Sequence, residues 1–501
     1  MHNSTILDIL RTFDENELKL FEEFLSSPYF NKKAAVIKLY KQIKKYAPEF
    51  VSQRLKKEKV WEALFKNKQY NYGLFKNYIY DLTKLAEKFV MYESIKKDNL
   101  HSQFSFLESL FDRQIKDLFE LKFKSLKNKI NHLQKNSEIE AKDKFEFLSK
   151  IYLLKSNFSD LFSRHPSIGD EFKQHSFFRI SLLLYSVLET SINAVNLSLK
   201  NFYDKDNDPV LLFVRKADSE NLISEFLNIL KKEQSGNYEI INVYYKYYLS
   251  ISDNDSIEKY LDFKDNLIRN SRSFSKPDLH NLYSGLRNTV INLTSPEFSK
   301  GKEFLDITKH MMKDDIVISK GGIMNEITFV SEIQTACSFA DAEFIEEFTD
   351  KYVRHLPKAS RDNMKKFAMA HLYFARNEFE KSLEQMLTIR YDLFGVKFYL
   401  KNLQMMICYE LNDYNSYLLI LDSYRHFLNN NRTVTVDWKK TQIVLLRFLT
   451  RLFNLKENYD EFEMKKLRQD ISSSIVLKKQ WLLRKIEELE SSPQLKINYN
   501  R

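Results

Sequence analysis

The stretch Asn-Glu-Phe-Glu-Lys-Ser-Leu at residues 377–383 decides how the chain is read, because a degenerate form of it recurs at a fixed interval. Ala342–Phe344, Asn377–Phe379 and Asn412–Tyr414 each place an acidic residue before an aromatic one, and successive triplets lie 35 residues apart. Four positions after each aromatic stands an apolar residue, again at that interval: Phe348, Leu383 and Leu418. Apolar residues spaced by four, within a constant period of this length, predict a repeated helix–turn–helix unit.

The second of these units resembles a tetratricopeptide repeat, a helix pair with a period of about 34 residues. In that family small and aromatic residues pack between the two helices, and the matching positions here are Ala370, Tyr373, Phe379 and Ser382. Ile389 and Phe394 depart from the pattern, because the family usually has a small residue and a proline there. The resemblance implies helix pairs stacked into a solenoid.

Over most of its length the chain is also similar to a group of bacterial helical-repeat proteins of about the same size. The residues that carry this likeness are 21–31, 371–387 and 421–431. It implies a fold and no activity.

Composition favours an all-α protein. Of 501 residues only eight are glycine and eight proline, so the corners of a turn-rich β architecture are missing. Apolar residues make up 43% and charged residues 29%, which is ordinary for a folded chain. We therefore expect a helical N-terminal module followed by an α-solenoid of helix–turn–helix repeats.

The pattern of apolar stripes and polar breaks divides the chain into four segments. Residues 1–98 form an N-terminal helical module, with helices near 15–26, 32–46, 57–65 and 72–92. Residues 99–215 form a bundle of long helices, or the start of the solenoid, with helices near 102–135, 138–160 and 172–200. Shorter helices occupy 216–319. Tetratricopeptide-like repeats and C-terminal helices occupy 320–501.

No motif for catalysis, cofactor binding or metal binding is present. The chain lacks a glycine-rich phosphate loop and a nucleophile elbow, and its histidines and cysteines do not show metal-ligand spacing. We therefore expect neither an enzyme nor a cofactor. Cys337 and Cys408 fall on apolar helical faces, where buried inert thiols are the usual outcome, and two lone cysteines suit a reducing compartment.

The expected location is the cytoplasm. The N-terminus lacks the unbroken apolar stretch of a signal peptide. The most apolar segment, residues 177–199, is interrupted by Arg179 and Glu189, so no membrane contact is expected.

The function expected first is that of a scaffold that binds a protein or peptide. A solenoid leaves a groove lined by the first helix of each pair. By the tetratricopeptide likeness, the groove positions include Glu332, His371, Asn402 and Tyr409. The ordinary alternative for these four is surface or packing, and His371 in particular lies on a mostly apolar face.

The rival function is nucleic-acid binding by the first part of the chain. The net charge is +10, and residues 1–200 carry a surplus of +9, whereas the rest carries +1. The helices near 57–65 and 72–92 are compatible with a helix-turn-helix, which would place Lys76, Asn77 and Tyr80 near the start of its second helix. A diffuse, well-solvated basic surface is the alternative explanation of the charge.

Overall fold

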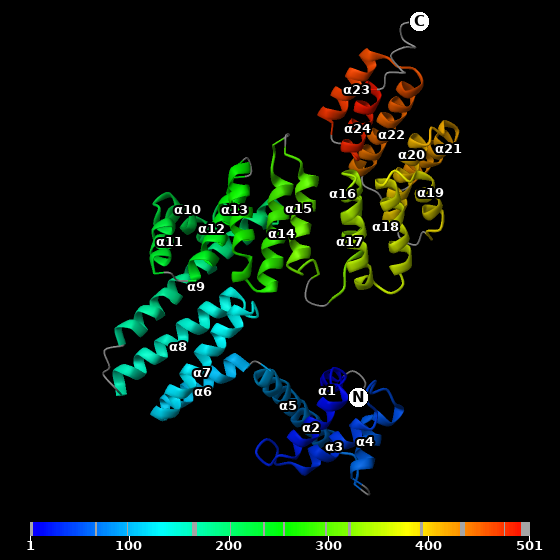
Figure 1. The fold of residues 1–501 in the computed structure, drawn as a ribbon. Coiled ribbons are helices and arrows are strands. Elements are labelled where there is room, and N and C mark those ends of the chain that lie inside the picture. Colours follow the sequence, from blue (N-terminus) through cyan, green and yellow to red (C-terminus); the bar gives the residue numbers. More distant parts are fainter. Residues whose placement is uncertain are drawn as a thin grey trace. The chain divides into compact units, whose positions relative to one another are not determined.

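The structure, a computed structural model, is helical throughout the part of the chain that it describes, with 24 α-helices and no strand there (Figure 1). The described residues are 4–65, 68–97, 99–162, 168–200, 202–233, 236–253, 256–295, 298–318, 322–390, 394–430, 436–474 and 476–491. The all-α prediction is confirmed.

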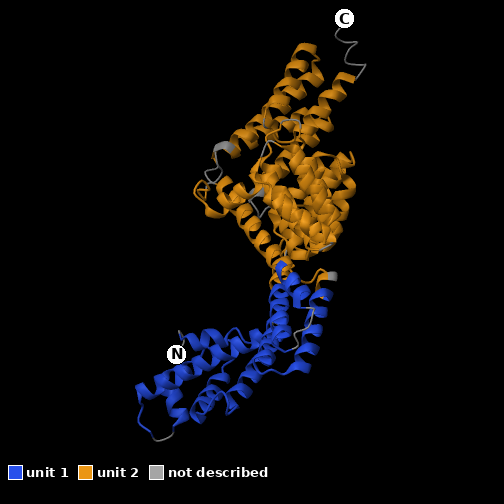
Figure 2. Ribbon diagram, turned by 90° about the vertical axis from the view of Figure 1, so that its left-hand side faces the viewer, with its two compact units in different colours: residues 1–132, 147–176 blue, residues 133–146, 177–501 orange. Residues whose placement is uncertain are grey.

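The chain divides into two compact units (Figure 2). Unit 1 comprises residues 1–132 and 147–176, and unit 2 comprises residues 133–146 and 177–501. The finer division into four segments stays a prediction. Its expected boundary at 319/320 lies outside the described residues, as does Asp98 beside the boundary at 98/99.

Unit 1 begins with five helices around one core. They are α1 (Thr5–Leu10), α2 (Glu15–Ser26), α3 (Ala34–Lys44), α4 (Lys57–Leu64) and α5 (Tyr72–Lys97). The start of α2 is fixed by a capping box, in which the Asp14 carboxylate accepts from the N–H of Glu17 at 2.7 Å and the Glu17 carboxylate accepts from that of Asp14. Phe21 and Tyr40 pack edge to face in the core, and the Tyr40 hydroxyl donates to the carbonyl of Leu18.

The rest of unit 1 comes from α6 (Asn99–Asp112) and most of α7 (Lys116–Lys135) and α8 (Ala141–Phe162). The rings of Phe119 and Phe158 stack at 3.9 Å between α7 and α8. The single helix expected over 102–135 is wrong, because α6 and α7 are separate. Gln114 adopts the left-handed conformation (φ 55°), and the N–H of Ile115 bonds back to the carbonyl of Leu110. This turn ends α6 without a glycine or proline.

Unit 2 contains the remaining helices. They are most of α9 (Ile168–Leu199), α10 (Pro209–Ser219), α11 (Leu222–Lys232), α12 (Asn237–Ser252), α13 (Ile257–Arg269), α14 (Lys276–Asn292), α15 (Lys300–Lys313), α16 (Glu326–Ser338), α17 (Ala342–Tyr352), α18 (Arg361–Ala375), α19 (Phe379–Leu387), α20 (Phe394–Glu410), α21 (Tyr414–Asn430), α22 (Val436–Glu457), α23 (Glu461–Ser473) and α24 (Lys479–Ser491). One continuous cluster of buried apolar side chains joins α15 to α24.

The α9 helix is long and apolar enough to cross a membrane by length and composition alone. Core helices of soluble proteins pass the same test, so it is weak evidence for a span. Within unit 2 the side chains of Leu184, Leu188 and Ile192 are buried in a protein core.

The helix pairs α16/α17, α18/α19 and α20/α21 are joined by the same kind of turn. In each turn one residue is left-handed, namely Ala340 (φ 54°), Asn377 (φ 61°) and Asn412 (φ 58°). The next N–H bonds to the carbonyl five residues earlier, from Asp341 to Ala336, from Glu378 to Tyr373 and from Asp413 to Cys408, at 2.9–3.0 Å. This is the Schellman arrangement, which satisfies the last carbonyls of a helix.

The spacing of the left-handed residues differs from the constant 35-residue spacing of the sequence triplets. From Asn377 to Asn412 it is 35, but from Ala340 to Asn377 it is 37. In the first pair the Asp341 side chain caps α17 by accepting from the N–H of Phe344, the third residue after it. Phe344 therefore lies inside α17 and is buried, whereas Phe379 begins α19 and is half-buried.

The small residues matched to the tetratricopeptide pattern lie against each other. Ala370 of α18 and Ser382 of α19 are both fully buried, and the Ser382 hydroxyl donates to the carbonyl of Ala370 at 2.6 Å. Larger side chains would separate the two helices at this point.

We expect Ala340→Gly to raise the free energy of unfolding by up to about 1 kcal/mol. A non-glycine residue in the left-handed region costs about 1–2 kcal/mol, which glycine avoids, although glycine loses more chain entropy on folding. Urea unfolding checks this. Ala368→Gly, inside α18, is the matched control and should destabilise by about 1 kcal/mol or more. Destabilisation by both substitutions would contradict the described turn.

Candidate functional site

The four residues predicted to line the repeat groove all lie in the interior. Glu332 is on α16, His371 on α18, and Asn402 and Tyr409 are on α20, and each is at most 5% exposed. Their role in binding a partner stays a prediction. In the described structure each is occupied by contacts within the chain.

Two of the four are held by polar contacts between helices. The Glu332 carboxylate pairs with Arg287 of α14 and accepts from the Thr308 hydroxyl of α15 at 2.9 Å. The Asn402 amide donates to Gln442 of α22 at 3.0 Å. These bonds tie α16 to α14 and α15, and α20 to α22, which is a packing role.

His371 belongs to a directed chain of hydrogen bonds. Its Nδ1 donates to the carbonyl of Phe367 at 2.8 Å, so its Nε2 is left as an acceptor for the side-chain amide of Gln334. The side-chain oxygen of Gln334 (Oε1) in turn accepts from the ammonium of Lys478, the residue before α24. The chain therefore requires a neutral histidine, because a proton on Nε2 would face an N–H donor.

Lys478 is half-buried, and its ammonium has no ion-pair partner among the described residues. The ammonium also donates to the backbone carbonyl of Gln334 at 3.4 Å and to the hydroxyl of Ser338 at 3.3 Å, and both of these acceptors are neutral. Burial lowers the pKa of Lys478. Burial, followed by the charge of Lys478, lowers the pKa of His371 to about 3. Both shifts follow from the low dielectric of this interior.

The α24 helix continues this contact along α20. The Trp481 indole N–H donates to the Glu410 carboxylate at 2.9 Å, and the Lys485 ammonium pairs with the same carboxylate at 2.9 Å. The rings of Trp481 and Tyr409 meet edge to face at 5.4 Å. The predicted groove residue Tyr409 thus packs against α24, and Lys478 bonds to the Gln334 side chain that contacts His371. The sequence does not predict either contact.

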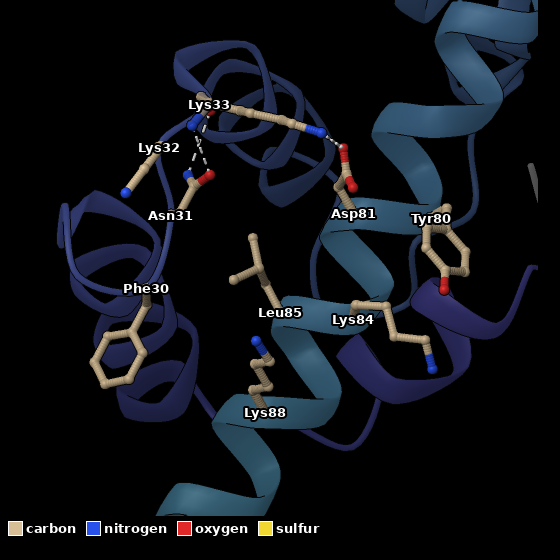
Figure 3. A pocket seen from close by; sticks show the side chains of 9 residues that line it. All are labelled: Phe30, Asn31, Lys32, Lys33, Tyr80, Asp81, Lys84, Leu85 and Lys88. Atoms are coloured by element: carbon tan, nitrogen blue, oxygen red, sulfur yellow. Dashed lines mark hydrogen bonds and ion pairs between the residues drawn. The ribbon is translucent and has the colours of Figure 1, made fainter.

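A second candidate site lies in unit 1, between the loop after α2 and the α5 helix. A pocket of about 240 Å³ is lined by Phe30, Asn31, Lys32, Lys33, Tyr80, Asp81, Lys84, Leu85 and Lys88. Figure 3 shows the loop residues on one side and the α5 residues on the other, with the Leu85 side chain pointing into the space between them.

The loop that forms one wall is held by specific bonds. The Asn31 amide donates to the carbonyl of Leu25 at 2.9 Å, and its oxygen accepts from the N–H of Lys33. The Lys33 ammonium reaches Asp81 on α5 at 2.6 Å (Figure 3). The ring of Phe30 stacks on Phe24 of α2 at 4.1 Å. These contacts fix the loop against α5, so the pocket is preformed.

The pocket is strongly basic. Four lysines line it against a single carboxylate, that of Asp81. Lys84 pairs with Glu87, whose carboxylate raises the pKa of Lys84. Lys32 and Lys88 are exposed and have no ion-pair partner in the part of the chain that the structure describes. An anion can therefore approach these two cations without displacing a carboxylate.

The three residues predicted to contact nucleic acid are all exposed on α5. The helix begins at Tyr72, as expected, and the Asn71 side chain accepts from the N–H of Leu74 near its start. Lys76 and Asn77 face solvent in its second turn. Tyr80 is 61% exposed and lines the pocket, where Lys84 lies over its ring. The structure therefore brings Tyr80 together with the basic pocket, while Lys76 and Asn77 lie outside it.

Little else in the described residues suggests chemistry. They contain no group of three or more histidine, cysteine, aspartate or glutamate side chains suited to a metal ion. Cys337 and Cys408 are buried, and burial raises the pKa of both thiols, for Cys408 to about 11. Neither thiol is placed as a nucleophile.

Comparisons with known proteins identify no relative. No family model, no curated protein and no solved structure matches the chain.

Acid should destabilise unit 2 through His371. Its pKa is about 3 in the folded chain and 6.5 ordinarily, so between these values the unfolded state binds more protons. Stability then falls with decreasing pH, by up to about 1.4 kcal/mol per pH unit, or roughly 2 kcal/mol from pH 6.5 to pH 5. Urea unfolding at a series of pH values measures the slope.

His371→Gln is the control, because the pH slope due to this residue should disappear in the variant. Comparing the two chains removes other titrating groups such as Asp278, whose pKa is raised to about 6 by burial and acts in the opposite sense. Equal slopes in both chains would show that His371 is not buried as described.

Proposed function

We propose that the protein is a non-catalytic binding protein that takes up single-stranded nucleic acid through the basic pocket of unit 1. The observation that carries the proposal is the exposed ring of Tyr80, placed at a preformed pocket whose rim holds Lys32, Lys84 and Lys88. The surplus of +9 in residues 1–200 supports it.

This combination suits a flexible strand with phosphates and unstacked bases. Lysine ammonium groups neutralise phosphates, and each contact releases condensed counterion. Aromatic side chains stack on bases with little sequence preference, at about 1–3 kcal/mol per base. Tyr80, Lys84 and Lys88 occupy successive turns of α5, so a strand that follows the helix would meet a ring and then two cations.

A duplex is the less suitable ligand. The helix-turn-helix reading relies on Lys76 and Asn77 near the start of α5, and both are exposed. The lysines of α5 that line the pocket, however, lie about two to three turns farther along the helix. An unpaired phosphate or base can enter a pocket of this size, whereas the wide surface of a duplex cannot.

A second candidate function is a cytoplasmic scaffold that binds a protein or peptide through the helix pairs of unit 2. It is supported by the shared turn of the pairs α16/α17, α18/α19 and α20/α21. It is supported also by the end of α20, where the Glu410 carboxylate accepts from the Trp481 indole and pairs with Lys485, because the same carboxylate chemistry suits a bound helix. The tetratricopeptide-like solenoid belongs to this proposal.

Reversing two charges of the pocket tests the first function. In the full chain, Lys84→Glu with Lys88→Glu should weaken binding of a labelled 20-nucleotide single strand at least ~tenfold. The slope of log affinity against log salt concentration should become shallower by about 1.4, because each lost phosphate contact on a single strand removes about 0.7 from the slope. Fluorescence anisotropy between low and physiological salt measures both quantities.

The matched control is Lys19→Glu with Lys38→Glu, which makes the same change in net charge at exposed lysines of α2 and α3 outside the pocket. It should change the affinity less than ~threefold, because it removes no pocket contact. Equal effects of the two double variants would show diffuse attraction and contradict the proposed site. Stronger binding of a duplex, with a dependence on Lys76, would favour the helix-turn-helix instead.

A further inference from the structure

We propose that the exposed rings of Tyr29 and Tyr92 form a second base-stacking surface beside the basic pocket of unit 1, and that a single strand bound in the pocket continues onto it. This inference rests on the single-strand function proposed above. It extends the site to two residues that do not line the pocket, one in the turn after α2 and one on α5.

The two tyrosines are joined to the pocket through Phe30, which lines it. The Tyr29 ring meets the Phe30 ring edge to face, with centroids 5.0 Å apart, and the Tyr92 ring does so at 5.9 Å. Figure 3 shows Phe30 on the loop side of the pocket, opposite the α5 residues. The two rings therefore continue the pocket and are not a separate patch.

Both rings are open to solvent. Tyr29 is 87% exposed, the largest fraction among the large apolar side chains that the structure describes, and Tyr92 is 51% exposed. A single exposed ring is ordinary on a protein surface. Two rings that share a neighbour and border a pocket with four lysines match a ligand that carries both flat bases and phosphates.

The turn that carries Tyr29 is held before any ligand binds. The N–H of Phe30 donates to the carbonyl of Ser27 at 3.1 Å, which closes a four-residue turn. Pro28 is the second residue of this turn, and its ring fixes φ there. Phe30 in turn stacks on Phe24, which is buried. Stacking on Tyr29 therefore costs little ordering of the backbone.

The order of rings and cations along α5 fits a strand that crosses the pocket. Tyr80 is followed by Lys84 and Lys88, and Tyr92 lies about one turn beyond Lys88. The rise from Tyr80 to Tyr92 is about 18 Å, which corresponds to about five nucleotides at the ~3.4 Å spacing of phosphates along one strand. Bases can then stack at both ends while the phosphates between them meet the lysines.

Removing the most exposed ring tests the inference. In the full chain, Tyr29→Ala should weaken binding of the labelled 20-nucleotide single strand at least ~fivefold, because a stacking contact of about 1 kcal/mol or more is lost. The slope of log affinity against log salt concentration should stay as in the wild type, because stacking releases no counterion. Fluorescence anisotropy measures both quantities.

Two variants serve as controls. Tyr29→Phe keeps the ring and should bind within ~twofold of the wild type. Phe462→Ala removes a ring that is 72% exposed on α23 of unit 2, and it should also bind within ~twofold. Equal losses in Tyr29→Ala and Tyr29→Phe would show that the hydroxyl rather than the ring makes the contact, and would overturn the inference.

Photocrosslinking of the wild-type chain gives a second measurement that needs no variant. A strand that contains 5-bromouridine reacts with an aromatic ring stacked on the halogenated base, and mass spectrometry should locate the crosslink at Tyr29 or Tyr92. An unchanged affinity of Tyr29→Ala, a shallower salt slope in that variant, or a bound strand without a crosslink to either ring would overturn the inference. The pocket function still stands in these cases if Lys84→Glu with Lys88→Glu weakens binding, whereas a wild-type chain that binds no single strand overturns both.

Discussion

The reversals of this chain depend on how a helix satisfies its last carbonyls. In six turns among the described residues, the residue after the helix is left-handed and the next N–H bonds back to the carbonyl five residues earlier. Glycine is the usual residue for that conformation, yet none of the six has it. The left-handed residues are Gln114, Ser137, Asp315, Ala340, Asn377 and Asn412. The chain therefore makes these turns with few glycines, because hydrogen bonds hold the left-handed residues in a conformation that glycine would adopt without strain.

This choice of turn residue decides how much of the fold could be predicted. Asn377 and Asn412 begin two of the triplets that predict turns, and asparagine tolerates the left-handed region that both adopt. Gln114 gives no such signal, so α6 and α7 read as one helix. Ala340 does not mark a turn in the sequence either. The triplet spacing therefore predicts the first repeat two residues out of register. The helical class follows from local pattern, whereas these two boundaries depend on left-handed residues of types that seldom mark a turn.

The candidate sites also combine features that local sequence predicts with features that depend on residues far apart in the chain. The exposure of Tyr80 could be predicted, because it depends only on where α5 begins. The basic pocket could not, because Lys32 and Lys33 reach α5 through a loop held by Asn31 and Asp81. The local sequence places His371 on a mostly apolar face, which is compatible with its burial. Its link through Gln334 to Lys478, more than a hundred residues later in the chain, has no trace in the local sequence.

Lysine is used in two opposite ways in this protein. Lys32 and Lys88 keep their hydration at an open pocket, so binding an anion there exchanges water and counterions for a phosphate at low cost. Lys478 bonds only to neutral acceptors, namely the backbone and side-chain oxygens of Gln334 and the Ser338 hydroxyl, and burial lowers its pKa. The first arrangement favours uptake of an external ligand, because the charges there are open to solvent. The second serves a contact within the chain, because it joins the segment before α24 to α16.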